Sequence, residues 1–161
     1  MRVYIFFLII FLFGLIGFEI KKRYIDQKNT LLFLKSFIEY IKMNISLYRL
    51  NIQEIINNYI IMQNNKNAKY VNLFPKNNNF NAINMKNIKN NILNKDLKLL
   101  IETYFFNLGK EDSCGEIKKA EQILMILDKM ISKTNEEVKL KGDLYFKILL
   151  SIGIVMVIVL W

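Results

Sequence analysis

Histidine is absent from this chain of 161 residues, cysteine and proline occur once each, and glycine occurs six times. Without histidine, and with Cys114 as the one thiol, the chain lacks the common zinc ligand sets, an intramolecular disulfide and the Ser-His or Cys-His pairs of nucleophilic enzymes. It also has no glycine-rich phosphate-binding loop. We therefore expect no catalytic residues, no metal site and no cofactor, and we do not expect an enzyme. Cys114 is interpreted as an inert small residue near a helix start rather than as a reactive thiol.

The low content of proline and glycine also bears on the fold class. An all-β sandwich needs turn residues about every 8–12 positions, more than this chain supplies. Leucine, isoleucine, lysine and asparagine dominate instead, and this composition is typical of helices with polar connections. We predict an all-α fold.

Long apolar runs stand near both ends of the sequence. Val3–Phe18 is apolar or glycine throughout, and Leu144–Trp161 is nearly so. A helix needs about 20 residues to cross roughly 30 Å of hydrocarbon. We therefore predict transmembrane helices at 1–20 and 144–161 and an antiparallel helical bundle at 21–143 between them.

Basic residues flank both runs on the side of the middle domain. Lys21-Lys22-Arg23 follows the first run directly, and three lysines stand around the start of the second. Because lysine and arginine in short flanks stay on the cytoplasmic side, we expect the middle domain in the cytoplasm. The alternative is a signal peptide cleaved after Gly17, which would make the chain an exported helical protein. The lack of an A-x-A cleavage site and the three cations favour an uncleaved anchor.

Glycine and glutamate near the end of the first run are candidates for helix contacts. Gly14 and Gly17 are similar to the small-residue faces by which membrane helices pack, although ordinary glycine usage explains them as well. Glu19 lies three residues before Lys22 and four before Arg23, at spacings that bring side chains together on a helix. We expect a simple ion pair there, with a functional role of Glu19 as the alternative.

Apolar residues in the first half of the middle domain recur in alternating steps of three and four. Three further apolar residues widen this heptad-like stripe, which suits a helix in a bundle better than a two-stranded zipper. A bundle core within the chain is the first interpretation, and an intermolecular coiled coil, which would make the chain a homo-oligomer, is the alternative. The stripe comprises Leu31, Leu34, Ile38, Ile41, Ile45, Tyr48, Ile52, Ile55, Tyr59 and Met62, and it is widened by Phe33, Phe37 and Ile56.

A break is predicted inside the stripe. Asn51 followed by Glu54 matches a helix N-cap with a reciprocating glutamate three residues on. Helices are therefore expected at Asp26–Asn44 and Ile52–Gln63. A low-complexity loop rich in asparagine is expected at 64–94, with its aromatic residues partly docked.

Helix signals return after the loop. The residues at helical spacing are Leu93, Leu97, Leu100, Ile101, Tyr104, Phe105 and Leu108. Gly109 supplies the left-handed residue that commonly ends a helix. Ser113 and Glu116 match a capping box for the next helix, and Asp112 adds negative charge at its positive end.

The sequence predicts no end for the last helix before Trp161. It starts near Cys114 and carries apolar residues at helical spacing, and no proline follows before Trp161. We expect it to continue into the second apolar run, with any bend near Gly142-Asp143. A continuous helix of this kind would act as a rigid strut between the domain and the membrane.

Two motifs give the sequence a family resemblance. Gly17-Phe18-Glu19-Ile20-Lys21-Lys22-Arg23-Tyr24 closes the first run, and Leu108-Gly109 with Asp112 precedes the long last helix. Together with the chain layout they resemble the stage III sporulation protein AB family of endospore-forming Firmicutes. The residues that carry the family motif, in a structural or interaction role, are Gly17, Phe18, Glu19, Leu108, Gly109 and Asp112.

The chain departs from the family pattern at three places. Asn51-Ile52 stands where the family usually has proline and leucine, and Glu116 stands where it has glutamine. The middle domain also lacks the tryptophan that the family often carries there. These departures leave the sharp turn before the second helix and the alignment of 64–94 open.

The resemblance implies a function. It places the protein in the mother-cell membrane around the forespore, in a secretion-like complex required for spore development. The implied partners are the other stage III A sporulation proteins, in particular the secretion-type ATPase stage III sporulation protein AA. It also implies a cytoplasmic domain similar to those of type II secretion platform proteins.

Other functions stay open at this point. A scaffold of another secretion or pilus system would fit the same layout. The formal charge of +9 would suit nucleic acid, but the lysines are scattered and form no recognisable motif. We expect attraction to membrane lipid instead and no nucleic-acid partner.

Overall fold

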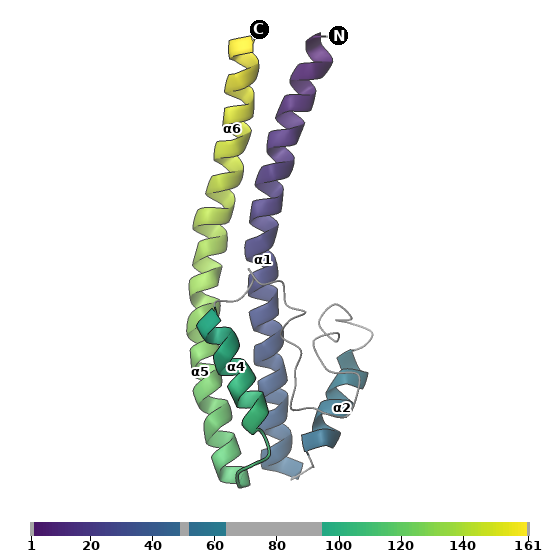
Figure 1. Ribbon diagram of the computed structural model, residues 1–161, viewed down its shortest axis with the longest axis vertical. Coiled ribbons are helices and arrows are strands. Elements are labelled where there is room, and N and C mark those ends of the chain that lie inside the picture. The colour runs from purple at the N-terminus through teal and green to yellow at the C-terminus, as the bar shows by residue number, and fades with distance from the viewer. Residues whose placement is uncertain (1, 49–51, 64–94, 161) are drawn as a thin grey trace. The chain divides into compact units, whose positions relative to one another are not determined.

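The computed structural model describes residues 2–48, 52–63 and 95–160. Every described element is helical, which confirms the all-α fold class for these ranges (Figure 1). The elements are α1 (Arg2–Tyr48), α2 (Ile52–Gln63), α4 (Lys95–Asn107), α5 (Ser113–Glu137), the π-helical segment η2 (Val138–Gly142) and α6 (Asp143–Leu160). The predicted loop at 64–94 lies outside the described residues.

The helix boundaries agree with the sequence in part. α2 has the predicted bounds, while its predicted cap Asn51 lies outside the described residues. The predicted start at Asp26 is wrong, because α1 is already helical from Arg2. No proline or glycine stands between Gly17 and Tyr48, so nothing in the backbone ends the hydrogen-bond ladder there.

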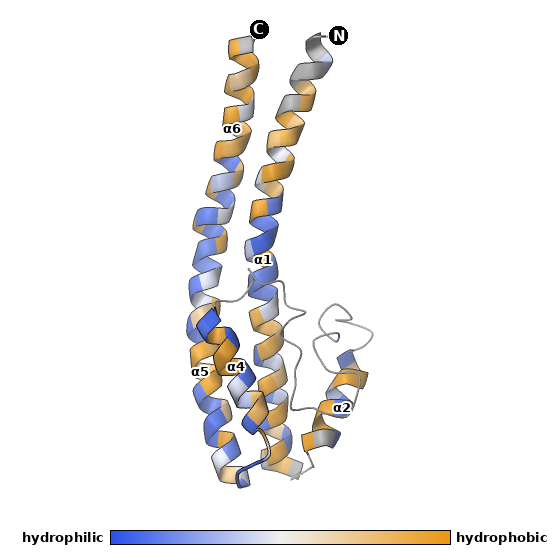
Figure 2. Cartoon of the chain, in the orientation of Figure 1, coloured by the Kyte–Doolittle hydropathy of each residue, from blue (hydrophilic) through white to orange (hydrophobic). Residues whose placement is uncertain are grey.

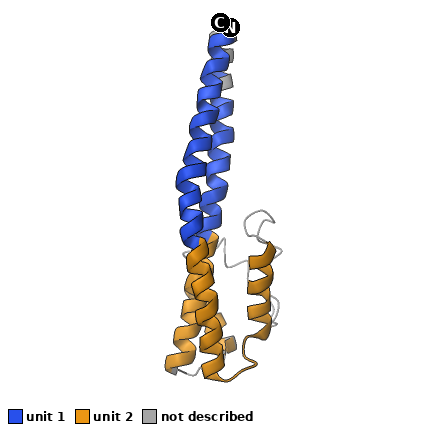
Figure 3. Cartoon of the chain, turned by 90° about the vertical axis from the view of Figure 1, so that its left-hand side faces the viewer, with its two compact units in different colours: residues 1–29, 131–161 blue, residues 30–130 orange. Residues whose placement is uncertain are grey.

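The chain divides into two compact units (Figure 3). Unit 1 comprises residues 1–29 and 131–161, and unit 2 comprises residues 30–130. α1 and α5 each contribute residues to both units. These limits differ from the predicted membrane boundaries, which stay predictions.

Unit 2 has an apolar core to which α1, α2, α4 and α5 contribute. Most members of the predicted stripe are part of it, so the stripe packs largely within the chain. Ile52 is half-buried and Met62 is 54% exposed, and the side chain of Tyr48 lies outside what the structure describes. Burying each large apolar side chain contributes about 1.5–3 kcal/mol. The core residues are Leu31, Phe33, Leu34, Phe37, Ile38, Ile41, Ile45, Ile55, Ile56, Tyr59, Leu97, Ile101, Tyr104, Phe105, Ala120, Ile123 and Leu127.

Ion pairs show that α1 and α5 are antiparallel in unit 2. Lys35 Nζ lies 2.6 Å from Asp128 Oδ1, and Lys42 Nζ lies 2.7 Å from Glu121 Oε1. Moving seven residues forward on α1 therefore moves seven residues backward on α5. The neighbouring Asp128 carboxylate raises the pKa of Lys35.

Tyr59 docks α2 against α1. Its ring centroid lies 4.8 Å from that of Phe37 and 5.1 Å from that of Tyr40. Its hydroxyl lies 2.8 Å from Ser36 Oγ, which satisfies the polar end of a buried ring. Burial raises the pKa of the Tyr59 phenol, because the charged form would lose its hydration. This aromatic contact fixes a short helix that would be marginal alone.

One helix among the described residues is long and apolar enough to cross a membrane. The helix runs from Ser113 to Val159, and 11% of its apolar stretch is buried inside the protein. Figure 2 shows that the C-terminal part of α6 is mostly apolar. The predicted second span is thus supported by length and composition. The predicted first span at 1–20 stays a prediction.

The helix changes geometry where the sequence allowed a bend. Residues Val138–Gly142 are π-helical, immediately before Asp143. A π-segment inserts an extra residue into a turn and often occurs at functional positions. The strut role proposed for this helix stays a prediction.

Candidate functional site

The turn between α4 and α5 holds one of the two family motifs. Gly109 has a φ of +86°, the left-handed conformation predicted for it. A Cβ atom at this position would lie 2.8 Å from Cδ1 of Ile52, at the start of α2. Gly109 is therefore required by its backbone conformation, and a side chain there would also displace the end of the Ile52 side chain. Leu108, next to it, is half-buried in the turn.

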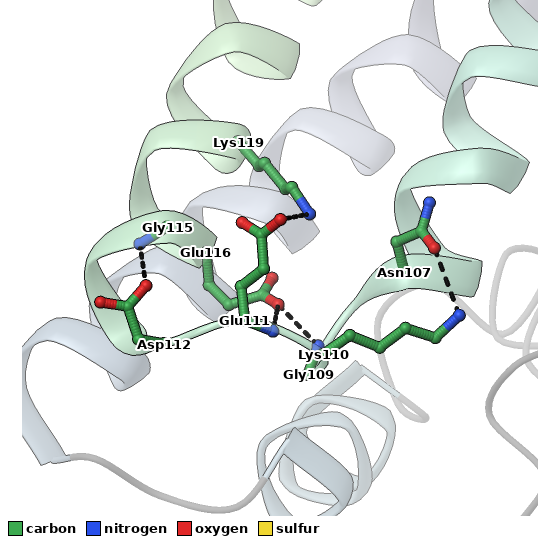
Figure 4. A network of polar contacts seen from close by, with 8 residues as sticks. All are labelled: Asn107, Gly109, Lys110, Glu111, Asp112, Gly115, Glu116 and Lys119. Carbon is green, nitrogen blue, oxygen red and sulfur yellow. Dashed lines mark hydrogen bonds and ion pairs between the residues drawn. The ribbon is translucent and has the colours of Figure 1, made fainter.

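Asp112 is the N-cap of α5 (Figure 4). Its backbone carbonyl accepts the N–H of Glu116 at 3.0 Å, and its side-chain Oδ1 accepts the N–H of Gly115 at 3.0 Å. The predicted capping box of Ser113 and Glu116 is therefore wrong. Because α5 starts at Ser113, the capping position falls one residue earlier, where the Asp112 carboxylate also meets the positive end of the helix.

The side chain of Glu116, in the first turn of α5, holds the α4–α5 turn by hydrogen bonds. Its Oε1 accepts the N–H of Gly109 at 2.9 Å and the N–H of Glu111 at 3.2 Å. The residue is only 2% exposed. Two backbone donors of the turn are thus satisfied by one carboxylate oxygen. The capping-box pattern predicted that Glu116 accepts a backbone N–H, but from Ser113 rather than from the turn.

Two buried oxygens beside this turn have no hydrogen-bond partner within the described residues. They are Oε2 of Glu116 and the hydroxyl of Tyr104. Burial, and then the negative charge of Glu116, raise the pKa of the Tyr104 phenol far above its usual value. Buried oxygens without a hydrogen-bond partner lower the stability of a fold. These two oxygens therefore offset part of the stability that the hydrogen bonds of Glu116 give to the turn.

Exposed contacts surround the turn. Lys119 Nζ lies 2.7 Å from Glu111 Oε1, and Lys110 Nζ donates to Asn107 Oδ1 at 3.2 Å. Lys110 also lies 3.8 Å above the ring of the exposed Phe106. The outer surface of the turn therefore presents an apolar ring beside charges of both signs.

The second family motif lies in unit 1, where α1 and α6 approach each other closely. A Cβ atom on Gly17 would lie 3.1 Å from Cα of Phe146. From the other helix, a Cβ atom on Gly153 would lie 3.2 Å from Cβ of Phe13. Small residues let membrane helices approach in this way. The predicted packing role thus fits Gly17, whereas Gly14 has no atom within 4 Å of its Cβ position.

The two motif residues after Gly17 have exposed side chains. Phe18 is 56% exposed, and Glu19 is also exposed. Within the described ranges Glu19 forms no ion pair, so the expected pair with Lys22 or Arg23 is wrong. Water solvates an exposed carboxylate well enough that helical spacing alone does not secure an ion pair.

Lys21 makes the ion pair of this region instead. Its Nζ lies 2.7 Å from Oδ1 of Asp143. The hydrogen bond from Lys21 and its positive charge lower the pKa of Asp143. Seven residues further along α1, Lys28 Nζ donates a hydrogen bond to Asn135 Oδ1 at 2.9 Å. These contacts set the antiparallel register of unit 1.

The six motif residues form two groups and not one site. Leu108, Gly109 and Asp112 lie in the α4–α5 turn of unit 2, whereas the Gly17-Phe18-Glu19 triplet belongs to unit 1. In residues 2–48, 52–63 and 95–160 no group of three His, Cys, Asp or Glu side chains could hold a metal ion. Cys114 is exposed with a free thiol. The arrangement supports helix packing and surface contacts.

Comparison with known proteins completes these observations. The model of the family described as stage III sporulation protein AB matches residues 2–161. No curated protein and no solved structure gives a match. The two groups of motif residues and this match over nearly the whole length show that the chain belongs to the stage III sporulation protein AB family.

Proposed function

We propose that the protein is a non-enzymatic membrane subunit of a sporulation-specific, secretion-like complex between mother cell and forespore. Family membership over residues 2–161 carries this proposal. In it, unit 1 is the membrane anchor and unit 2 is a cytoplasmic domain that docks the ATPase of the complex, stage III sporulation protein AA. The similarity of this domain to type II secretion platforms is part of the proposal.

The surface of unit 1 supports a double membrane anchor. α6 is apolar enough to cross a bilayer, and it packs against α1 through Gly17 and Gly153. The part of α1 paired with α6 therefore lies at the same depth. Its outward side chains are apolar and 48–69% exposed: Phe7, Leu8, Phe11, Leu12, Leu15 and Ile16. Such a surface is stable in lipid and would aggregate in water.

Topology can be tested with the natural thiol. Cys114 is the one cysteine and is exposed. A membrane-impermeant maleimide should leave it unlabelled in intact cells and label it after the membrane is opened, with Cys114→Ser as the blank. Labelling in intact cells would contradict a cytoplasmic unit 2.

The role in development can be tested genetically. Deleting the gene in a spore-former should stop development after engulfment and sharply reduce the spore count. Complementation with the full chain should restore spores. A normal spore count in the deletion strain would refute the proposed function.

ATPase docking can be tested on the free cations of α5. Lys118 and Lys129 are exposed and make no ion pair in the described part of the chain, unlike Lys119, which is held by Glu111. Lys118→Glu and Lys129→Glu should reduce ATPase co-purification without changing helicity. Lys98→Glu on α4 is the control for an equal change of charge. Undiminished recovery with charge reversals over the whole surface of unit 2 would remove the docking proposal.

A further inference from the structure

Unit 1 has a shallow groove between α1 and α6. Its volume is about 150 Å³, and it is lined by Phe18, Lys21, Lys22 and Ile25 of α1 and by Phe146 of α6. Phe18, Lys22 and Ile25 share one face of α1, because they are spaced by four and three residues. The lining is mostly apolar, with ammonium groups at its edge.

The charges at this edge are unequal. Lys21 is neutralised by Asp143 at 2.7 Å. Lys22 is exposed and has no ion-pair partner within the described residues, and the exposed Arg23 follows it. The groove therefore combines an apolar floor with one free ammonium group.

The position of the groove along the chain matches the edge of a membrane. It starts at Phe18, where the apolar run ends, and it extends to the basic cluster. In a chain anchored by unit 1 this level is the inner lipid headgroup region. Basic pockets between membrane helices on the cytoplasmic side are suited to anionic headgroups.

We propose that this groove binds an anionic phospholipid. Lys22 would contact the phosphate, and Phe18, Ile25 and Phe146 would contact the first part of an acyl chain. This assigns the exposed motif residue Phe18 to lipid contact rather than to helix packing. A free phosphate ion would leave the apolar floor unused, and a neutral lipid would leave Lys22 unused. The inference rests on the membrane placement in the proposed function.

The test uses the full chain in detergent. The chain is titrated with phosphatidylglycerol or phosphatidylcholine carrying identical acyl chains, and retained lipid is counted by native mass spectrometry. We expect retention of phosphatidylglycerol at lower concentration. Lys22→Gln should raise the concentration needed about fivefold, the effect of one cation near a lipid surface. Lys139→Gln removes an equal charge from an exposed lysine outside the groove and should change little.

A second pair of variants tests the apolar floor. Phe18→Ala should weaken retention of both lipids, and Phe11→Ala, at a similarly exposed position outside the groove, should not. Ile25→Ala replaces Phe18→Ala if that variant loses helicity.

Three results would overturn the lipid site. They are equal retention of the two lipids, equal effects of Lys22→Gln and Lys139→Gln, and displacement of the lipid by excess inorganic phosphate. Release of the wild-type chain from membranes by alkaline carbonate would instead refute the membrane anchor itself. The failure of the lipid site and the failure of the proposed function are thus distinguishable.

Discussion

Truncating Glu116 should loosen the α4–α5 turn without unfolding the helices. The carboxylate accepts the N–H groups of Gly109 and Glu111 at 2.9 and 3.2 Å. Hydrogen bonds to a charged acceptor contribute about 1.5–3 kcal/mol each. The unpartnered Oε2 offsets part of this, since a buried unsatisfied polar atom costs about 1–3 kcal/mol. We expect Glu116→Ala to lower the free energy of local opening by about 2 kcal/mol.

Hydrogen exchange measures this opening directly. The free-energy change corresponds to roughly 30-fold faster exchange at the amides of Gly109 and Glu111. Mass spectrometry of the peptide around the turn, on the full chain in detergent, would resolve it. Peptides from the middle of α1 serve as the internal reference.

The glutamine variant separates hydrogen bonding from charge. Glu116→Gln keeps an oxygen for the two N–H groups and replaces the unpartnered oxygen with an amide donor. The weaker neutral hydrogen bonds and the removal of a buried charge act in opposite directions. Exchange is therefore expected within about threefold of the parent.

A matched control and two contrary outcomes complete the design. Glu121→Gln removes an exposed carboxylate from the same helix, at its ion pair with Lys42, and should leave exchange of the turn unchanged. Unaltered exchange in Glu116→Ala would refute the fastening role. Exchange in Glu116→Gln as fast as in Glu116→Ala would show that the charge, and not the acceptor geometry, holds the turn.

Predictions for three other positions in these contacts follow, two of them with a matched variant. Gly17→Ala should weaken unit 1, because its Cβ would lie 3.1 Å from the Phe146 backbone, whereas Gly14→Ala should be neutral or slightly stabilising; equal urea midpoints would contradict this. Tyr104→Phe should be neutral or stabilising by up to about 1 kcal/mol, since it removes an unpartnered buried hydroxyl. Because burial holds the Tyr104 phenol neutral in the folded chain, its titration leaves stability unchanged below pH 10 and lowers stability above pH 10, where the phenol of the unfolded chain ionises. The phenylalanine variant has no phenol to ionise and should lose less stability in alkali. Asp112→Ala should cost about 1 kcal/mol through loss of the cap, and Asp112→Asn should retain most of it in the same urea titration.

A pattern visible in the sequence explains the helix register. Lysines recur every seven residues on α1, and residues with acceptor side chains recur every seven on α5. Lys35 and Lys42 each directly follow a buried apolar residue of α1, and Glu121 and Asp128 each directly follow one of α5. Residues at these positions flank the apolar contact and face each other when the helices are antiparallel. The pairs observed within the two units are Lys42–Glu121, Lys35–Asp128 and Lys28–Asn135. The seven-residue spacing can be read in the sequence, but it predicts the helix register only once α5 is known to pack against α1.

The same register continues to the π-segment. A further step of seven from Asn135 leads to Gly142, and a Cβ atom there would lie 3.8 Å from Cα of Lys21. Gly142 has no side chain to pair with this lysine, and the carboxylate of the next residue, Asp143, lies 2.7 Å from Lys21 Nζ. The heptad pattern alone could not predict this partner, because Asp143 falls one residue outside it.

The sequence by itself determined the helical class, the bounds of α2, the left-handed Gly109 and the family. These depend on short-range patterns: apolar periodicity, scarce proline and a glycine after a helix. Only the tertiary structure decided that Asp112 and not Ser113 caps α5, that Glu116 holds the turn, and that Lys21 rather than Glu19 forms the ion pair at the end of the first apolar run. Each of these depends on which groups the packing brings within hydrogen-bond distance, and several partners then compete for the same donor or acceptor.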